Sequence, residues 1–140
     1  MILIEKNTDF PFPHAFDKEK LILWLEQCIK KFQIKINTLT ISFLNDNDLL
    51  EINKTVFNRD YLTDTVSLSY KEDGHAYSGE IYISLERVKD NAEQYQTSYF
   101  NELLRVVIHS FLHVIGYDDH TPGEKEAMRC LEELCLDIYS

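Results

Sequence analysis

The segment from Ser98 to Ile115 constrains the fold most, because its apolar residues cover almost the whole circumference of a helix. Glu102 lies in the first turn that we expect of this helix. The apolar residues are Leu103, Leu104, Val106, Val107, Ile108, Phe111, Leu112, Val114 and Ile115. A helix that is apolar on nearly every side is buried on most of them. The sequence therefore predicts a central helix against which a sheet and the other helices pack.

Two histidines interrupt this apolar surface. His109 and His113 are four residues apart, so on a helix with about 3.6 residues per turn their side chains lie one above the other. Two imidazoles at this spacing can bind one metal ion. A pair of hydrogen-bonded core histidines is the alternative interpretation. Gly116 follows, where a residue without a Cβ atom can end the helix in the left-handed conformation and reverse the chain.

The reversal would bring a third metal ligand, Asp119 or His120, toward the two imidazoles. Three protein ligands and an open position are typical of a catalytic zinc site, whereas a structural site has four protein ligands. We therefore expect one zinc ion. The spacing also resembles the zinc-protease helix H-E-x-x-H-x-x-G-x-x-H. In those proteases a glutamate base follows the first histidine, but here Ser110 follows it and cannot act as that base.

The composition limits the class of protein. A chain of 140 residues is long enough to form one domain, residues 1–140, with a core that needs no disulfides. Its net charge of −10 argues against a broad basic surface for DNA, but a local groove of Lys and Arg beside a metal can still bind RNA. No apolar run approaches the roughly 20 residues of a membrane span. Residues 1–12 lack a secretory signal, and we interpret Cys28, Cys130 and Cys135 as reduced core thiols of a cytoplasmic protein.

Hydrophobic patterns and capping residues predict the other elements. Polar residues make the segment 71–78 a connecting loop, with His75 exposed. We expect strands at 1–5, 39–44 and 65–70 and one that begins at 81–83, and helices after Asp17, at 46–56, at 85–96 and after the cap Thr121.

Three segments in the same order resemble the YbeY family of zinc-dependent endoribonucleases, the rRNA maturation factors. Residues 109–120 are similar to the family signature H-G-x-L-H-x-x-G-Y-D-H. Asn53 with residues 63–67 resembles N-x9-T-D-V-L-S, and residues 79–84 resemble G-D-I-x-I-S. The family's fold is a single α+β domain with a four-stranded mixed sheet and the metal-bearing helix behind it, which agrees with the predicted order of elements.

The sequence departs from the family pattern at three positions. Ser110 replaces a glycine, and because serine is small we expect it to be tolerated. The family's third histidine corresponds to Asp119, which we expect to be the third ligand, with the next residue, His120, as the alternative. The family's arginine four residues after the asparagine is Phe57 here, so its role either passes to Arg59 or is absent.

The resemblance implies an endoribonuclease that cuts single-stranded RNA, in late maturation of 16S rRNA at its 3′ end and in ribosome quality control. Ribosomal subunits or assembly proteins are the expected partners, without DNA or membrane. We expect Arg59 to contact phosphate, and Thr63, Asp64 and Ser67 to contact the metal ligands or a phosphate; a turn and strand cap is the alternative for these three. No general base stands out. The rival interpretations are a zinc-protease-like hydrolase and a non-enzymatic ribosome-assembly factor with a structural metal.

Overall fold

Four strands form one mixed sheet in the order β1-β2-β4-β3. The structure, a computed structural model, describes residues 1–71 and 76–139. The first three strands of this order are parallel to one another, and β3 pairs antiparallel with β4 at the edge of the sheet. The strand bounds are β1 Ile2–Lys6, β2 Lys35–Leu44, β3 Thr65–Lys71 and β4 Ala76–Ser84.

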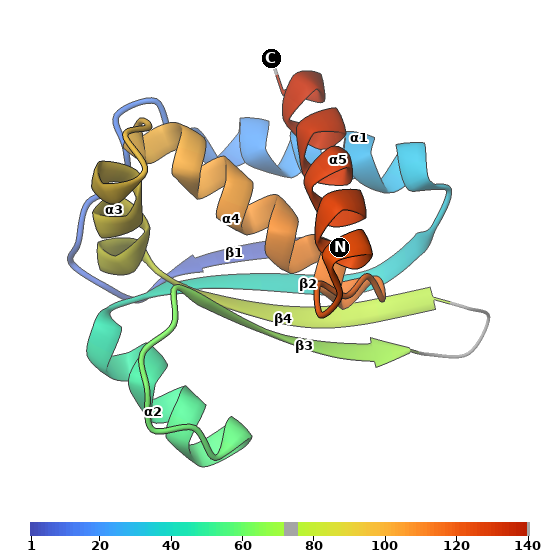
Figure 1. The fold of residues 1–140 in the computed structure, drawn as a ribbon. Helices are drawn as coiled ribbons and strands as arrows, with labels where there is room; N and C mark the ends of the chain where they lie inside the picture. Colours follow the sequence, from blue (N-terminus) through green and yellow to red (C-terminus); the bar gives the residue numbers. More distant parts are fainter. Residues whose placement is uncertain (72–75, 140) are drawn as a thin grey trace.

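Five helices in the described ranges complete the α+β domain that the sequence predicted. Figure 1 shows α1, α4 and α5 over one face of the sheet, α3 beside α4, and α2 on the opposite side. Each helix begins after a residue whose side chain accepts a hydrogen bond from a backbone amide of the first turn; these residues are Asp17, Asn45, Ser84, Ser98 and Thr121. The bounds are α1 Lys18–Phe32, α2 Asp46–Phe57, α3 Leu85–Gln94, α4 Tyr99–Val114 and α5 Pro122–Ile138.

Helix α4 is the central element, as its composition predicted. It contacts β3, β4, α3 and α5, and all of its apolar residues from Leu103 to Val114 are buried. The side of the sheet that it covers contributes Leu39, Ile41, Phe43, Ile81 and Ile83 to the same core. The core therefore surrounds the helix that carries both motif histidines.

The C-terminal end of α4 is held very close to the sheet. A Cβ atom placed on Gly79 of β4 would lie 2.5 Å from Cγ1 of Val114, so only a glycine permits this approach. The Ser69 hydroxyl of β3 donates a hydrogen bond to the Val114 carbonyl oxygen. Gly116 then takes a φ of 103°, and its left-handed conformation turns the chain back. These contacts fix the backbone immediately after His113.

Several boundaries differ from the sequence-based expectations. β2 begins at Lys35, not at residue 39, and β4 begins at Ala76 within the expected loop. The extra residues of the two strands pair with each other, with an irregularity in register between Ile36 and Thr38. In β2 these residues are largely exposed and polar, so they lack the alternation of apolar residues that predicts a strand. His75 lies outside the described residues. Cys130 is exposed, so only two of the three cysteines are core thiols. No helix in the ranges 1–71 and 76–139 is long and apolar enough to span a membrane.

The contact between Gly79 and Val114 generates a prediction about stability. The Gly79→Ala substitution adds a methyl group where there is no room, and such overpacking typically costs about 1–3 kcal/mol. We expect urea unfolding to show a loss of this size. Gly123→Ala is the matched control, because nothing lies within 4 Å of its Cβ position. Equal unfolding free energies for the two variants would show that the close approach does not constrain the fold.

Candidate metal centre

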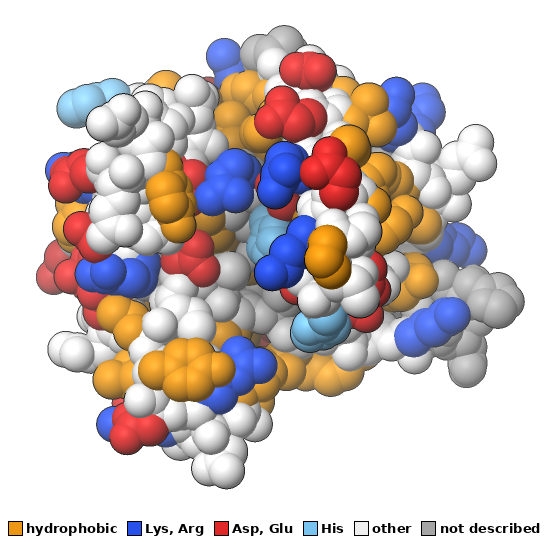
Figure 2. All heavy atoms as spheres, in the orientation of Figure 1, with side chains coloured by type: hydrophobic (Ala, Val, Ile, Leu, Met, Phe, Trp, Pro, Cys, Tyr) orange, Lys and Arg blue, Asp and Glu red, His pale blue; other side chains and the backbone are white. Residues whose placement is uncertain are grey.

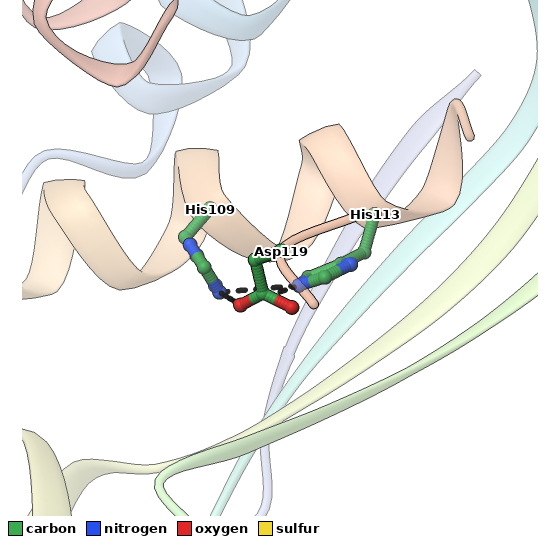
Figure 3. Close-up of side chains that lie close together, drawn as sticks. All are labelled: His109, His113 and Asp119. Atoms are coloured by element: carbon green, nitrogen blue, oxygen red, sulfur yellow. Dashed lines mark hydrogen bonds and ion pairs between the residues drawn. The ribbon is translucent and has the colours of Figure 1, made fainter. Parts of the chain in front are cut away.

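Three side chains converge at the end of α4 (Figure 3). His109 and His113 project from the helix, and Asp119 reaches them from the loop that leads to α5. The Nε2 atoms of the two imidazoles lie 3.2 Å apart. Each Nε2 atom also lies 3.6 Å from Oδ2 of Asp119. Two ring nitrogens and a carboxylate oxygen thus point toward one small volume.

This group fits a divalent metal ion. A tetrahedral zinc ion with bonds of about 2.0–2.1 Å separates its ligand atoms by roughly 3.3–3.4 Å. The separations of 3.2 and 3.6 Å bracket that value. The donor set also matches catalytic zinc sites, in which His and carboxylate ligands leave one position open. His109, His113 and Asp119 could therefore hold one ion and leave a position for water or substrate.

The loop geometry distinguishes Asp119 from His120 as the third ligand. His120 has a side chain that is 81% exposed, and its Nε2 lies 4.0 Å from Oδ1 of Asp118. At the start of the loop, the Tyr117 amide donates to the Leu112 carbonyl oxygen at 3.0 Å. At its end, the capping box of α5 fixes Thr121. A short loop fixed at both ends brings Asp119, and not His120, to the imidazoles.

A buried carboxylate lies behind the first histidine. Oε2 of Glu132 on α5 is 2.7 Å from Nδ1 of His109. This hydrogen bond raises the pKa of His109, although burial lowers it. Because the pKa of His109 is raised overall, a proton still competes with a metal for this ring at a pH where an ordinary histidine is already neutral. Sequence reasoning missed Glu132, although a signal was available. It is a charged residue four positions after Met128 and three before Cys135, within the buried stripe of its helix.

The same cavity brings together the other residues that the sequence singled out. It has a volume of about 540 Å³, and its lining includes Arg59, Thr63, Asp64, Ser67 and the metal-binding group. In Figure 2 a hollow near the centre of the visible face exposes a histidine side chain, with Lys and Arg side chains at its rim. The expected site residues, which are spread over 60 positions of the chain, therefore face one space.

Two of these residues also support the loop before β3. Thr63 Oγ1 accepts a hydrogen bond from the buried Asn53 side chain of α2 at 3.0 Å. Oδ2 of Asp64 accepts one from Asn91 of α3 at 3.1 Å. Both hydrogen bonds fit the alternative interpretation as a turn, and they leave the side chains at the cavity wall.

Arg59 differs from the other arginine of the cavity. Its guanidinium carbon lies 4.9 Å from the centre of the Phe57 ring. No carboxylate of the described ranges lies within ion-pair distance of it. Arg105, in contrast, is bound to Glu102 through two hydrogen bonds of 3.0 and 2.8 Å. Arg59 is therefore the cation that is available to a phosphate, and Phe57, in the place of the family's arginine, supports it.

Ser110 does not face the metal-binding group. It is fully buried, and its hydroxyl lies 2.8 Å from the Thr65 hydroxyl and donates to the Val106 carbonyl oxygen at 2.7 Å. The serine thus joins α4 to β3. Its position is inconsistent with the glutamate base of the zinc proteases.

The donor geometry generates a prediction about metal binding. Removing a group next to a metal ligand costs about 10–100-fold in affinity, so removing a ligand itself should cost at least as much. We expect the substitutions His109→Ala, His113→Ala and Asp119→Ala each to weaken zinc binding by more than about tenfold in a competitive chelator titration. His120→Ala is the control and should bind zinc as the wild type does. A larger loss in this control than in Asp119→Ala would transfer the ligand role to His120.

Comparison with known proteins supports the family suggested by the motifs. The family model described as Endoribonuclease YbeY matches residues 5–140. An endoribonuclease YbeY from Bacteroides fragilis is 37% identical over 119 residues, which cover 85% of each chain. The one from Amoebophilus asiaticus is 41% identical over 113 residues, or 81% of this chain and 77% of the relative.

A solved structure agrees with the fold. The solution structure of TM1509 from Thermotoga maritima aligns with a TM-score of 0.71 at 26% identity and covers 99% of this chain and 89% of that protein. The match to the family model extends over nearly the whole chain, including all three motifs. The chain therefore belongs to the endoribonuclease YbeY family.

Proposed function

We propose that the protein is a zinc-dependent endoribonuclease that cuts single-stranded RNA in the cytoplasm during maturation of ribosomal RNA. One observation carries the proposal: a three-donor metal group lines the same cavity as Arg59, which forms no ion pair with the residues that the structure describes. The names of the relatives support the reaction class. His109, His113 and Asp119 would hold one zinc ion, which supplies Lewis acidity toward a phosphodiester.

Arg59 would bind a phosphate of the RNA. A guanidinium forms charge-assisted hydrogen bonds with phosphate oxygens, and the stacking on Phe57 limits the positions that this guanidinium can take. Its backbone is also fixed, because the Arg59 amide donates to the Asn53 carbonyl oxygen at 2.8 Å. The net charge of −10 opposes RNA elsewhere on the surface. Binding should therefore be weak and sensitive to salt, with ribosomal subunits or assembly proteins helping to deliver the substrate.

The cavity favours attack by the RNA's own 2′-hydroxyl. The residue after His109 is a buried serine that faces β3, so it cannot serve as a general base. Attack by the 2′-hydroxyl requires mainly a fixed geometry and stabilisation of the developing charge. The 2′-oxygen bonds to phosphorus and loses its proton to solvent, while the bond from phosphorus to the 5′-oxygen breaks and that oxygen takes up a proton. The products are a 2′,3′-cyclic phosphate and a 5′-hydroxyl, and the route is impossible on DNA, which lacks the 2′-hydroxyl. We therefore propose that cleavage requires ribose at the cut site.

A substrate comparison tests this function. Labelled single-stranded RNA, DNA of the same sequence and casein are incubated with the wild type and with His113→Ala. We expect the wild type to cut RNA only and the variant to cut none of the three. Casein digestion that disappears in the variant would identify a protease instead. DNA cleavage as fast as RNA cleavage would exclude the 2′-hydroxyl from the reaction. A wild type that cuts none of the substrates, but loses stability when zinc is removed, would support the assembly-factor interpretation.

The role of Arg59 has its own test. Arg59→Ala should slow RNA cleavage by about 10–100-fold, because it removes charge-assisted hydrogen bonds to the phosphate, each of which contributes about 1.5–3 kcal/mol. Zinc affinity should not change, since Arg59 does not belong to the metal-binding group. Lys54→Ala is the matched control, because Lys54 is a cation of α2 that is paired with Asp60 at 3.6 Å. Equal rates for the two variants would remove Arg59 from the phosphate site.

A further inference from the structure

We propose that Glu132 is the positioning residue of the metal centre, and that it holds His109 in the ring tautomer that can bind metal through Nε2. The inference rests on the metal site proposed above. Glu132 approaches the ring from α5, on the side opposite to Asp119. Its Oε2 atom is 2.7 Å from Nδ1, whereas Oδ2 of Asp119 is 3.6 Å from Nε2. The two carboxylates therefore lie next to different nitrogens of the same imidazole.

The two tautomers of this ring have different consequences. A neutral imidazole carries one N–H group and one free lone pair. A carboxylate accepts hydrogen bonds only, so Glu132 favours the proton on Nδ1 and leaves the lone pair on Nε2. Without Glu132, the ring can instead carry its proton on Nε2 and donate a hydrogen bond from that nitrogen to Asp119. That tautomer blocks the nitrogen that faces His113 and Asp119. Glu132 would thus keep the lone pair on Nε2 available for metal binding in the metal-free protein.

A buried carboxylate needs support of its own. The Glu132 side chain is only 8% exposed, and an unpaired charge at such a site is strongly unfavourable. Nη1 of Arg105 lies 3.7 Å from its Oε1 atom. Arg105 is in turn fixed by the Glu102 side chain, which is 1% exposed. Glu102, Arg105, Glu132 and His109 thus form a continuous chain of contacts that joins α5 to α4.

Stability alone does not explain this chain of charges. Apolar residues of similar size would fill the space between α4 and α5 at least as favourably, because the free energy of removing charged groups from water offsets most of their mutual attraction. A role in orienting His109 gives a reason for a glutamate at this position. It also explains why a charged residue lies between Met128 and Cys135 on the buried face of α5.

The test compares substitutions at two adjacent residues of α5. Glu132→Ala removes the acceptor, Glu132→Gln keeps an oxygen that can accept from Nδ1, and Glu133→Ala is the control at an exposed neighbour. Zinc affinity is measured by chelator competition, and the stability of the metal-free proteins by urea unfolding. We expect Glu132→Ala to weaken zinc binding by about 10–100-fold. Glu132→Gln should lose less than this, and Glu133→Ala should match the wild type.

The ring nitrogens provide a second readout that does not depend on metal or on activity. In ¹⁵N NMR spectra of the metal-free protein above the pKa of His109, the wild type should carry its ring proton on Nδ1. Glu132→Ala should shift this proton toward Nε2. Unchanged zinc affinity in Glu132→Ala, or a ring proton on Nε2 in the wild type, would overturn the inference and leave the proposed nuclease intact. Failure of the wild type to bind zinc would overturn both proposals. A stability loss in Glu132→Ala without a change in affinity or tautomer would assign Glu132 a purely structural role.

Discussion

The structure depends on the burial of α4, because a helix that is packed on most sides cannot rotate about its axis, so each side chain keeps its direction. The sheet supplies one wall of this enclosure, and α3 and α5 supply others. The approach of Val114 to Gly79 and the hydrogen bond from Ser69 fix the end of the helix beside His113. Two histidines on such a helix have a fixed backbone spacing, which reduces the entropic cost of binding an ion.

The charged residues near His109 form two groups, one where α5 packs on α4 and one in the cavity that contains Arg59. Behind His109, the buried carboxylates of Glu102 and Glu132 are both paired with Arg105, whose side chain is 41% exposed. In this cavity Arg59 is exposed, lies over the Phe57 ring and forms no ion pair with a carboxylate of the described residues. An acidic protein can in this way present a small cationic site to RNA. Of the carboxylates that line this cavity, Asp64 accepts a hydrogen bond from Asn91, and Asp119 points toward the two imidazoles.

The sequence predicted the parts of the fold and site that depend on local patterns. The apolar circumference of α4, the spacing of its histidines and the glycine after them required no knowledge of distant residues. Glu132 was missed because its contact with His109, 23 residues earlier in the chain, appears only when α5 packs on α4. The first residues of β2 and β4 were missed for a similar reason: they pair with each other, and those of β2 are largely polar and exposed. The choice between Asp119 and His120 likewise depends on the path of a short loop.

The coordination of the bound ion is the most direct measurement of the metal centre. X-ray absorption at the zinc edge, recorded on the purified zinc-loaded protein, reports ligand types and distances. We expect nitrogen and oxygen ligands at about 2.0–2.1 Å, with the outer-shell scattering of two imidazoles and no sulfur. The same spectrum should be obtained from His120→Ala. A sulfur ligand at about 2.3 Å, or the scattering of a third imidazole that disappears in His120→Ala, would contradict a site built from His109, His113 and Asp119.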